Sequence, residues 1–254
     1  MFHRLAYLVV FASLIVFTAV LPARAAEDLS PSQTKAVEGI IKDYLMAHPE
    51  VIFEAVQAMK ARDAATTQAQ AMVELKSNSK ALRHDPNSFV GGNPDGNVTV
   101  VEFFDYRCGY CKKVHPVVTE LLESDKNIRL VYKEFPILGP QSKLAAIAAI
   151  AALRSDPGKY LDFHNALMTA RGDLDHQAVQ DIAAEVGLDV KALTTAMRDP
   201  EISPIVARNY QLAQVLGITG TPGFVIGDTI VPGYIDLNQM RELIEQARAE
   251  CKTC

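Results

Sequence analysis

The sequence predicts an α/β domain that follows a helical extension, and three observations lead to this fold class. A strand, a helix and a second strand follow one another over residues 98–135. Several helical patterns and no convincing strand fill residues 140–216. A hairpin and a final helix occupy residues 221–249, whereas residues 30–80 are helical in pattern from end to end.

Composition and charge limit the kind of protein this is. The 254 residues are 49% apolar and 22% charged, which is ordinary for a globular chain of one or two domains. The formal net charge is −5, and no basic block or aromatic-interleaved basic stripe occurs. Nucleic-acid binding is therefore disfavoured.

The first 25 residues differ from the rest of the chain. Residues 5–21 carry no charge, and Pro22 and the small-residue pattern Ala23-Arg24-Ala25 follow them. This arrangement predicts a signal peptide over residues 1–25 that is cleaved on export to the periplasm. An uncleaved membrane anchor is the alternative, although an apolar run of 17 residues is at the short limit for a span.

Residues 26–85 form the predicted helical extension and linker. Two amphipathic helices are expected, one beginning at Ser30-Pro31 and one after His48-Pro49, and the apolar pattern thins out over residues 60–80. Two short helices cannot enclose a core. Their apolar faces must therefore pack on the same subunit or, as we expect, on other copies in a homo-oligomer formed through residues 30–60.

The domain predicted over residues 86–254 begins with a Gly-, Pro- and Asn-rich boundary and a short strand at Ser88 to Val90. Val98 to Phe104 is a buried strand, residues 109–124 form a helix, and Ile128 to Phe135 is a second strand. Such a unit is right-handed with parallel strands. Further along, the hairpin turns at Gly227-Asp228 and Asp236 can cap the last helix.

The segment FFDYRCGYCKKVHP places Cys108 and Cys111 where the first strand gives way to the helix. Unpaired N–H groups and the helix dipole favour a thiolate there. An ordinary cysteine has a pKa of about 8.5, and at a helix N-terminus in a C-x-x-C pair the value can fall to ~3.5–7. Such a pair could be a structural staple, a metal clamp or a redox switch.

The redox interpretation is favoured over the other two. A stapled scaffold would carry more than four cysteines in less chain, and a metal site needs further ligands, of which only His115 is near in sequence. In thiol exchange Cys108 attacks and forms a mixed disulfide, and Cys111 resolves it.

Glu102 is the candidate base for the proton of Cys111. It places a charge inside the apolar run VVEFF, which is costly unless the group is functional, and burial should raise its pKa. A solvent-facing glutamate on an edge strand is the alternative.

The motifs VEFFDYRCGYC and GITGTPGFVIGD, with the helical stretch between them, resemble thiol:disulfide oxidoreductases of the DsbA type over residues 86–250. The resemblance implies a thioredoxin fold with a helical domain inserted at about residues 138–216. It also implies a cis peptide before Pro222, and a Thr221-Pro222 loop that lies against Cys108.

By the same resemblance, Glu102 is the buried acid beneath the dithiol. The dipeptide Gly109-Tyr110 tunes the redox couple and, with Thr221 and Pro222, contacts substrate. Gly-Tyr also resembles the dipeptide of the disulfide isomerase DsbC. The segment IIKDYLMAHPEVIFEAVQAM resembles the oligomerising extension of the ScsC subgroup, associated with suppression of copper sensitivity, which includes trimers with isomerase activity.

These features predict a periplasmic disulfide isomerase, with a trimer favoured, that acts on unfolded or misoxidised exported proteins and exchanges electrons with a membrane redox partner. The chemistry requires no cofactor. A net dithiol oxidase of the DsbA type is one alternative. A copper-sequestering protein that uses both C-x-x-C pairs is another, because Cys251 and Cys254 could bind Cu(I), relay electrons or simply form a local disulfide.

Overall fold

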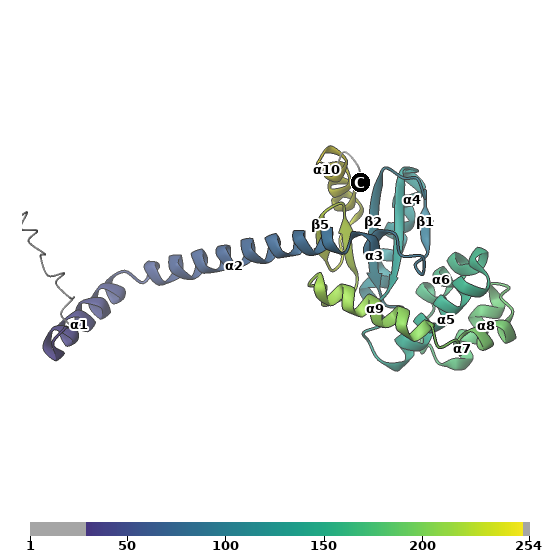
Figure 1. Ribbon diagram of the computed structural model, residues 1–254, viewed down its shortest axis with the longest axis horizontal. Helices are drawn as coiled ribbons and strands as arrows, with labels where there is room; N and C mark the ends of the chain where they lie inside the picture. Colours follow the sequence, from purple (N-terminus) through teal and green to yellow (C-terminus); the bar gives the residue numbers. More distant parts are fainter. Residues whose placement is uncertain (1–28, 251–254) are drawn as a thin grey trace, which may run out of the picture. The chain divides into compact units, whose positions relative to one another are not determined.

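The computed structural model describes residues 29–250 (Figure 1), so the predicted signal peptide and the Cys251/Cys254 pair lie outside the described residues. The chain divides into two compact units, one ending at Ala61 and the other beginning at Arg62. Among the described residues, no helix combines the length and the apolar character needed to cross a bilayer.

The first unit contains helix α1 (Pro31–Ala47) and the beginning of α2 (Glu50–Ser77). The start of α1 is fixed by a capping box, because Ser30 Oγ accepts a hydrogen bond from the Gln33 backbone at 3.4 Å and Gln33 Oε1 accepts one from Ser30 N at 2.9 Å. No residue between 29 and 61 is buried, so this unit has no core of its own.

The second unit is built on a five-stranded sheet in the order β1-β3-β2-β4-β5. Its strands are β1 (Val90–Gly92), β2 (Val98–Phe104), β3 (Ile128–Glu134), β4 (Gly223–Ile226) and β5 (Thr229–Pro232). Strands β2 and β3 are parallel and joined through α4 (Gly109–Ser124), and the other pairs are antiparallel. All seven residues of β2 are buried, as the run VTVVEFF predicts for a central strand.

Alternate residues of β2 face two separate cores. Val100 and Phe104 belong to a cluster with α4 and the final helix α10 (Leu237–Glu250). Val101 and Phe103 belong to a second cluster on the opposite face of the sheet. That second cluster also contains Leu75, Leu82, Leu212 and Leu216.

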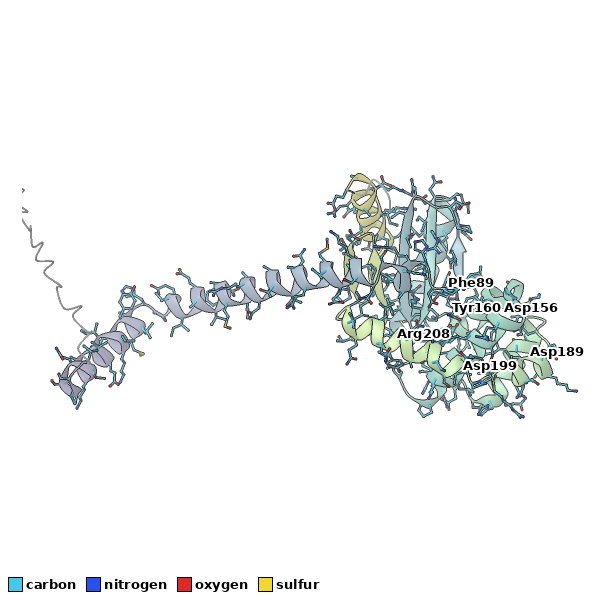
Figure 2. The ribbon with its side chains drawn as sticks, in the orientation of Figure 1. Phe89, Asp156, Tyr160, Asp189, Asp199 and Arg208 are labelled. Carbon is cyan, nitrogen blue, oxygen red and sulfur yellow. The ribbon has the colours of Figure 1, made fainter. Side chains whose placement is uncertain are left out.

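The segment between β3 and β4 is helical, with one 3₁₀ turn, η1 (Pro157–Lys159). Its helices are α5 (Pro140–Ser155), α6 (Tyr160–Thr169), α7 (His176–Glu185), α8 (Val190–Ala196) and α9 (Ile202–Val215). Helices α5 to α8 gather beside the sheet (Figure 1), and the Tyr160 ring packs on Phe89, with ring centroids 4.4 Å apart (Figure 2). The thioredoxin fold with an inserted helical domain and an N-terminal helical extension is thereby confirmed.

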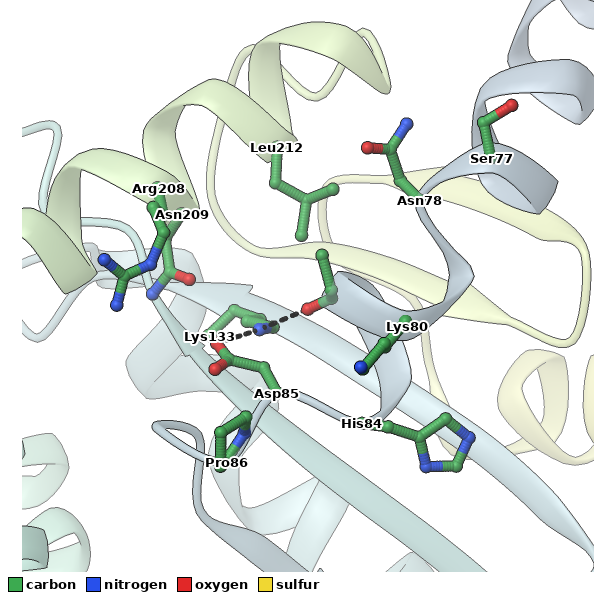
Figure 3. Close-up of a pocket in the computed structure, with 11 residues that line it drawn as sticks. Ser77, Asn78, Lys80, His84, Asp85, Pro86, Lys133, Arg208, Asn209 and Leu212 are labelled. Atoms are coloured by element: carbon green, nitrogen blue, oxygen red, sulfur yellow. Dashed lines mark hydrogen bonds and ion pairs between the residues drawn. The ribbon is translucent and has the colours of Figure 1, made fainter.

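The buried Lys133 of β3 anchors α3 (Ser79–Arg83) and the residues that follow it to the sheet (Figure 3). Lys133 Nζ lies 2.8 Å from Asp85 Oδ2 and donates to Ala81 O at 2.8 Å, and the Lys133 side chain is only 1% exposed. The sequence places residues 60–80 in a thinly apolar linker and begins the domain at residue 86. In the structure α2 is a continuous helix to Ser77, and Leu75 and Leu82 already pack in the core of the second unit.

Two further local features depend on hydrogen bonds near the ends of elements. The first strand is expected at Ser88 to Val90 but runs from Val90 to Gly92, because these three residues pair with β3. Asp236 does cap the final helix, since its Oδ1 accepts from Gln239 N at 2.9 Å.

Candidate active site

Cys108 occupies the N-cap position of α4, four residues after the end of β2 at Phe104. Its Sγ accepts a hydrogen bond from Cys111 N at 3.4 Å and lies 3.2 Å from the carbonyl oxygen of Thr221. The residue is 7% exposed, and both Cys108 and Cys111 are free thiols. The strand-to-helix turn therefore brings together three residues that span 113 positions of sequence.

Hydrogen bonding stabilises the charged form of Cys108. The Cys111 thiol donates to the Cys108 sulfur, and this contact lowers the pKa of Cys108 from its ordinary 9.0 to about 5, although burial acts in the opposite direction. Backbone N–H groups at the helix N-terminus, from Cys111 and Tyr110, lower it further. Cys108 is therefore a thiolate at neutral pH.

Cys111 has the opposite character. It lies one turn into α4 and is fully buried. Donation of its proton to Cys108 and burial both raise the pKa of Cys111 well above its usual range. The two thiols thus form an asymmetric pair in which one sulfur is charged and the other keeps its proton.

Glu102 lies in the middle of β2, opposite Tyr132 of β3 and Phe224 of β4. It shares the sheet face of Val100 and Phe104, which is the face that α4 covers. It is 4% exposed, so an edge-strand position in solvent is excluded. Burial, and then the nearby Cys108 thiolate, raise the pKa of Glu102 to about 8.

The other predicted site residues flank Cys108. Gly109 has open space on its Cβ side, and Tyr110 is 63% exposed, so the dipeptide between the cysteines faces solvent. The Thr221-Pro222 peptide is cis, and the Thr221 carbonyl faces Cys108 Sγ. Cys251 and Cys254 lie outside the described residues.

A buried polar cluster beside the site was not predicted from the sequence. Glu134 Oε1 accepts from the hydroxyls of Tyr106 at 3.0 Å and Tyr160 at 3.2 Å, and Tyr106 also contacts His164 Nδ1 at 3.1 Å. Burial raises the pKa of Glu134 well above its usual range, and burial, with a lesser effect of His115, lowers that of His164 to about 3. The cluster joins the active-site loop to α6 through neutral groups.

The structure describes the side chains of residues 29–250. Within that part of the chain, no group of three or more His, Cys, Asp or Glu residues is arranged to hold a metal ion. The side chains gathered at the turn are the Cys108/Cys111 dithiol and the Glu102 carboxyl group beneath it.

Two protein families match the chain. The DSBA-like thioredoxin domain matches residues 99–245, and the N-terminal domain of the copper resistance protein ScsC matches residues 33–66. The first match contains both cysteines, Glu102 and the Thr221-Pro222 loop, and the second covers α1 and the first part of α2.

Solved structures and curated proteins are also similar to the chain. A thioredoxin-like oxidoreductase from Silicibacter pomeroyi DSS-3 is 47% identical, with a TM-score of 0.65 over 68% of this chain and 98% of its own. Proteus mirabilis ScsC in a transitional conformation is 31% identical, with a TM-score of 0.65 over 88% and 99%. The Na(+)/H(+) antiporter NhaA 1 of Salinispora arenicola (strain CNS-205) is 29% identical over 168 residues, 65% of this chain, but the chain spans only 26% of that protein's length.

Proposed function

Because the chain belongs to the DSBA-like thioredoxin family, and is a thiol:disulfide oxidoreductase of the DsbA/ScsC type, we propose that it is a disulfide isomerase of misoxidised periplasmic proteins. The observation that carries this proposal is the asymmetry of the dithiol. A charged, hydrogen-bonded Cys108 lies beside a buried Cys111 that holds its proton.

The reaction begins at the Cys108 thiolate. It attacks one sulfur of a substrate disulfide, so that a bond forms between Cys108 and that sulfur while the substrate disulfide breaks and its other sulfur leaves as a thiolate. The exposed Gly109-Tyr110 dipeptide and the Thr221 carbonyl border the place where the substrate sulfur must arrive.

The lifetime of the mixed disulfide decides the outcome. Cys111 can displace the substrate only after losing its proton, and burial opposes that loss. A slow resolving thiol leaves time for another substrate thiolate to attack the bound sulfur, which forms a new substrate disulfide and releases Cys108 as a thiolate. No electrons are gained or lost by the enzyme in that cycle, which is isomerisation.

Glu102 controls when Cys111 can act. The raised pKa of Glu102 has two causes, burial and the charge of the Cys108 thiolate. Formation of the mixed disulfide removes that charge, so the carboxyl ionises more readily at the stage when Cys111 needs a base. If no substrate thiolate intervenes, Cys111 then attacks Cys108, releases a reduced substrate and leaves an oxidised enzyme.

Isomerisation also benefits from several sites that face one substrate. The first unit exposes the apolar side chains of Ile40, Ile41, Met46, Ile52 and Phe53, each more than half exposed in the single chain. A shallow cavity of about 450 Å³ between the two helices is lined mainly by such side chains. Exposed apolar patches of this kind mark interaction surfaces, and we propose a homo-oligomer, with a trimer favoured, formed through residues 30–60.

Refolding of ribonuclease with scrambled disulfides tests the isomerase proposal. The reduced protein should restore ribonuclease activity in a glutathione buffer, and the Cys108→Ser variant should not. Absence of any unscrambling by an active thiol-exchange enzyme would exclude isomerisation.

A net dithiol oxidase is the second candidate, because stabilising the Cys108 thiolate stabilises the reduced form and makes the disulfide more oxidising. Equilibration with glutathione measures the reduction potential. An oxidase would combine a strongly oxidising potential with oxidation of reduced ribonuclease and no unscrambling. Either activity requires a partner that resets the dithiol, and we propose one in the membrane.

Light scattering tests the oligomer. The chain without residues 1–25 should have the mass of a trimer, and Ile41→Asp should give a monomer because it places a charge in the apolar face. Lys35→Gln, at an exposed position of α1 outside that cavity, is the control and should keep the trimer. A monomer of the unmutated chain without residues 1–25 would contradict the proposal.

A further inference from the structure

A cavity of about 340 Å³ adjoins the active-site turn. On one side it is formed by the active-site loop and α4, and on the other by the loop between α6 and α7. Its walls include Tyr106, Arg107, Lys112, Ala170, Arg171 and Leu174. The inserted helical domain therefore completes a concave surface beside the turn that carries Cys108.

Two residues that line the cavity flank Cys108 in the sequence. Arg107 immediately precedes Cys108, and Lys112 follows it by four residues, which is one turn of α4. Successive residues of an extended chain advance by only about 3.3 Å. A side chain a few positions from the substrate cysteine could therefore reach the cavity while that cysteine is bound to Cys108.

The charge in the cavity is positive and incompletely neutralised. Arg107, Lys112 and Arg171 are all cationic, and the facing carboxylate is Asp173, whose Oδ1 lies 3.6 Å from Arg107 Nη2. Asp105 lies two residues before Arg107, but its two oxygens accept the N–H groups of Arg107 and Leu138. This positive cavity belongs to a protein whose formal net charge is −5.

Lys112 and Arg171 have N–H groups that can donate hydrogen bonds to a further acceptor. Lys112 Nζ donates to the carbonyl oxygen of Ala170, which leaves two of its three N–H groups for another acceptor. Arg171 is exposed and makes no ion pair within residues 29–250. Burial, and then the charge of Arg107, lower the pKa of Lys112, so the two cations repel each other and an anion between them would relieve the repulsion.

We infer that this cavity is a carboxylate-binding subsite that selects substrate polypeptides with an aspartate or glutamate near the reacting cysteine. The inference rests on the proposed exchange at Cys108 and adds a preference among its substrates. Arginine suits the role because its planar guanidinium binds a carboxylate through two parallel hydrogen bonds. Since the cavity opens to solvent, the attraction should speed association and weaken with salt.

Three peptides test the subsite. They share one sequence and one cysteine, carry Glu, Gln or Lys two positions from that cysteine, and are joined to thionitrobenzoate by a disulfide. Attack of Cys108 on the peptide sulfur transfers the peptide to the enzyme and releases coloured thionitrobenzoate, so stopped-flow absorbance gives the rate. We expect the Glu peptide to react about three to ten times faster than the Gln peptide, and the Lys peptide to be slowest.

Two comparisons show whether the cavity causes the preference. Arg171→Gln should reduce the Glu-to-Gln ratio, whereas Arg208→Gln, which removes an exposed arginine from a different cavity, should leave that ratio unchanged. For the wild-type protein, raising the salt from 20 to 500 mM should bring the ratio close to one. If neither the Arg171→Gln substitution nor added salt changes the Glu-to-Gln rate ratio, the inference is wrong.

The remaining outcomes separate this inference from the proposed function. Equal rates for the three peptides would refute the preference among polypeptide substrates and leave thiol exchange intact, whereas no reaction with any peptide would refute the exchange function and the subsite with it. Oxidised glutathione and its neutral ester form a further pair. A preference for glutathione over the ester, with no discrimination among the peptides, would overturn the assignment to polypeptide substrates.

Discussion

Glu102 and Lys133 are buried ionisable residues on neighbouring strands that face opposite sides of the sheet. Glu102 pairs in register with Tyr132, and Lys133 with Phe103, so their side chains alternate across the pleat. Lys133 has a carboxylate partner at 2.8 Å and a carbonyl acceptor. Glu102 has the Cys108 thiolate near it, which disfavours its ionised form.

The difference shows that one face of the sheet carries a buried ionisable group that stabilises the fold, while the other carries one that takes part in the chemistry. Asp85 and the Ala81 carbonyl oxygen both bind the buried Lys133 ammonium, and these contacts hold the end of α3 against the sheet. A buried carboxyl beside a like charge has a pKa near neutrality and can change its protonation during a reaction. The two faces should therefore respond differently to mutation.

The largest expected effect is on the dithiol face. Cys108→Ser removes the nucleophile and should lower insulin reduction at least about 10³-fold. Cys111→Ser is the matched variant, since it keeps the nucleophile and should accumulate mixed disulfides visible on non-reducing gels. Insulin reduction that survives the loss of Cys108 would show that the reactive sulfur lies elsewhere.

On the opposite face, Asp85→Ala leaves the Lys133 ammonium buried without its partner. The free energy of unfolding should fall by about 3 kcal/mol, measured by urea denaturation, while the rate of thiol exchange stays within twofold. The control is Asp228→Ala, which breaks the more exposed Arg83–Asp228 pair of 2.9 Å and should cost at most ~1 kcal/mol. Equal losses for the two variants would contradict the structural role of the buried pair.

Glu102→Gln should affect the chemistry far more than the stability. Removing the base should slow resolution by Cys111 roughly 10²-fold, so rapid-quench experiments should trap more mixed disulfide, whereas the first attack continues. Glu134→Gln is the control, because it alters another buried carboxyl and still accepts from Tyr106 and Tyr160. If Cys111 resolves the mixed disulfide at the wild-type rate in both variants, Glu102 is not the base.

The smallest effect is the pH dependence of stability of the reduced protein. The lowered pKa of Cys108 adds stability that is present above pH 9.0 and is lost as the pH falls toward about 5. The raised pKa of Glu102 acts oppositely, because its contribution is present below pH 4.5 and is lost as the pH rises toward about 8.

Between pH 5 and 8 these two contributions should nearly cancel in the wild-type protein. In Glu102→Gln only the Cys108 contribution remains, so the free energy of unfolding should increase with pH, by at most ~1 kcal/mol per pH unit. Urea denaturation at several pH values measures both proteins. If the free energy of unfolding changes with pH in the same way in the wild-type protein and in Glu102→Gln, Cys108 and Glu102 do not make opposing contributions.

Much of this arrangement can be predicted from the sequence where the signal is local. The buried strand at Val98 to Phe104 and the helix over 109–124 agree with β2 and α4 as observed. The same local reasoning predicts a buried Glu102, because a charge interrupts an apolar run.

The rest depends on contacts between distant segments. Lys133 and Glu134 also interrupt an apolar run, IRLVYKEF, so the signal that marks Glu102 could have identified them as buried, but not their partners. Asp85 lies 48 residues from Lys133, and His164 lies 58 residues from Tyr106. The cavity beside Cys108 likewise needs the fold of the inserted domain to bring Arg171 to Arg107 and Lys112.

The most direct test of the account is the titration of Cys108 itself. The reduced protein is alkylated with iodoacetamide at a series of pH values, and mass spectrometry follows the modification of each cysteine. We expect the rate at Cys108 to rise with a midpoint near pH 5, while Cys111 remains unreactive. A midpoint near the ordinary value of 9.0 would mean that the start of α4 does not hold a thiolate, and would contradict the proposed mechanism.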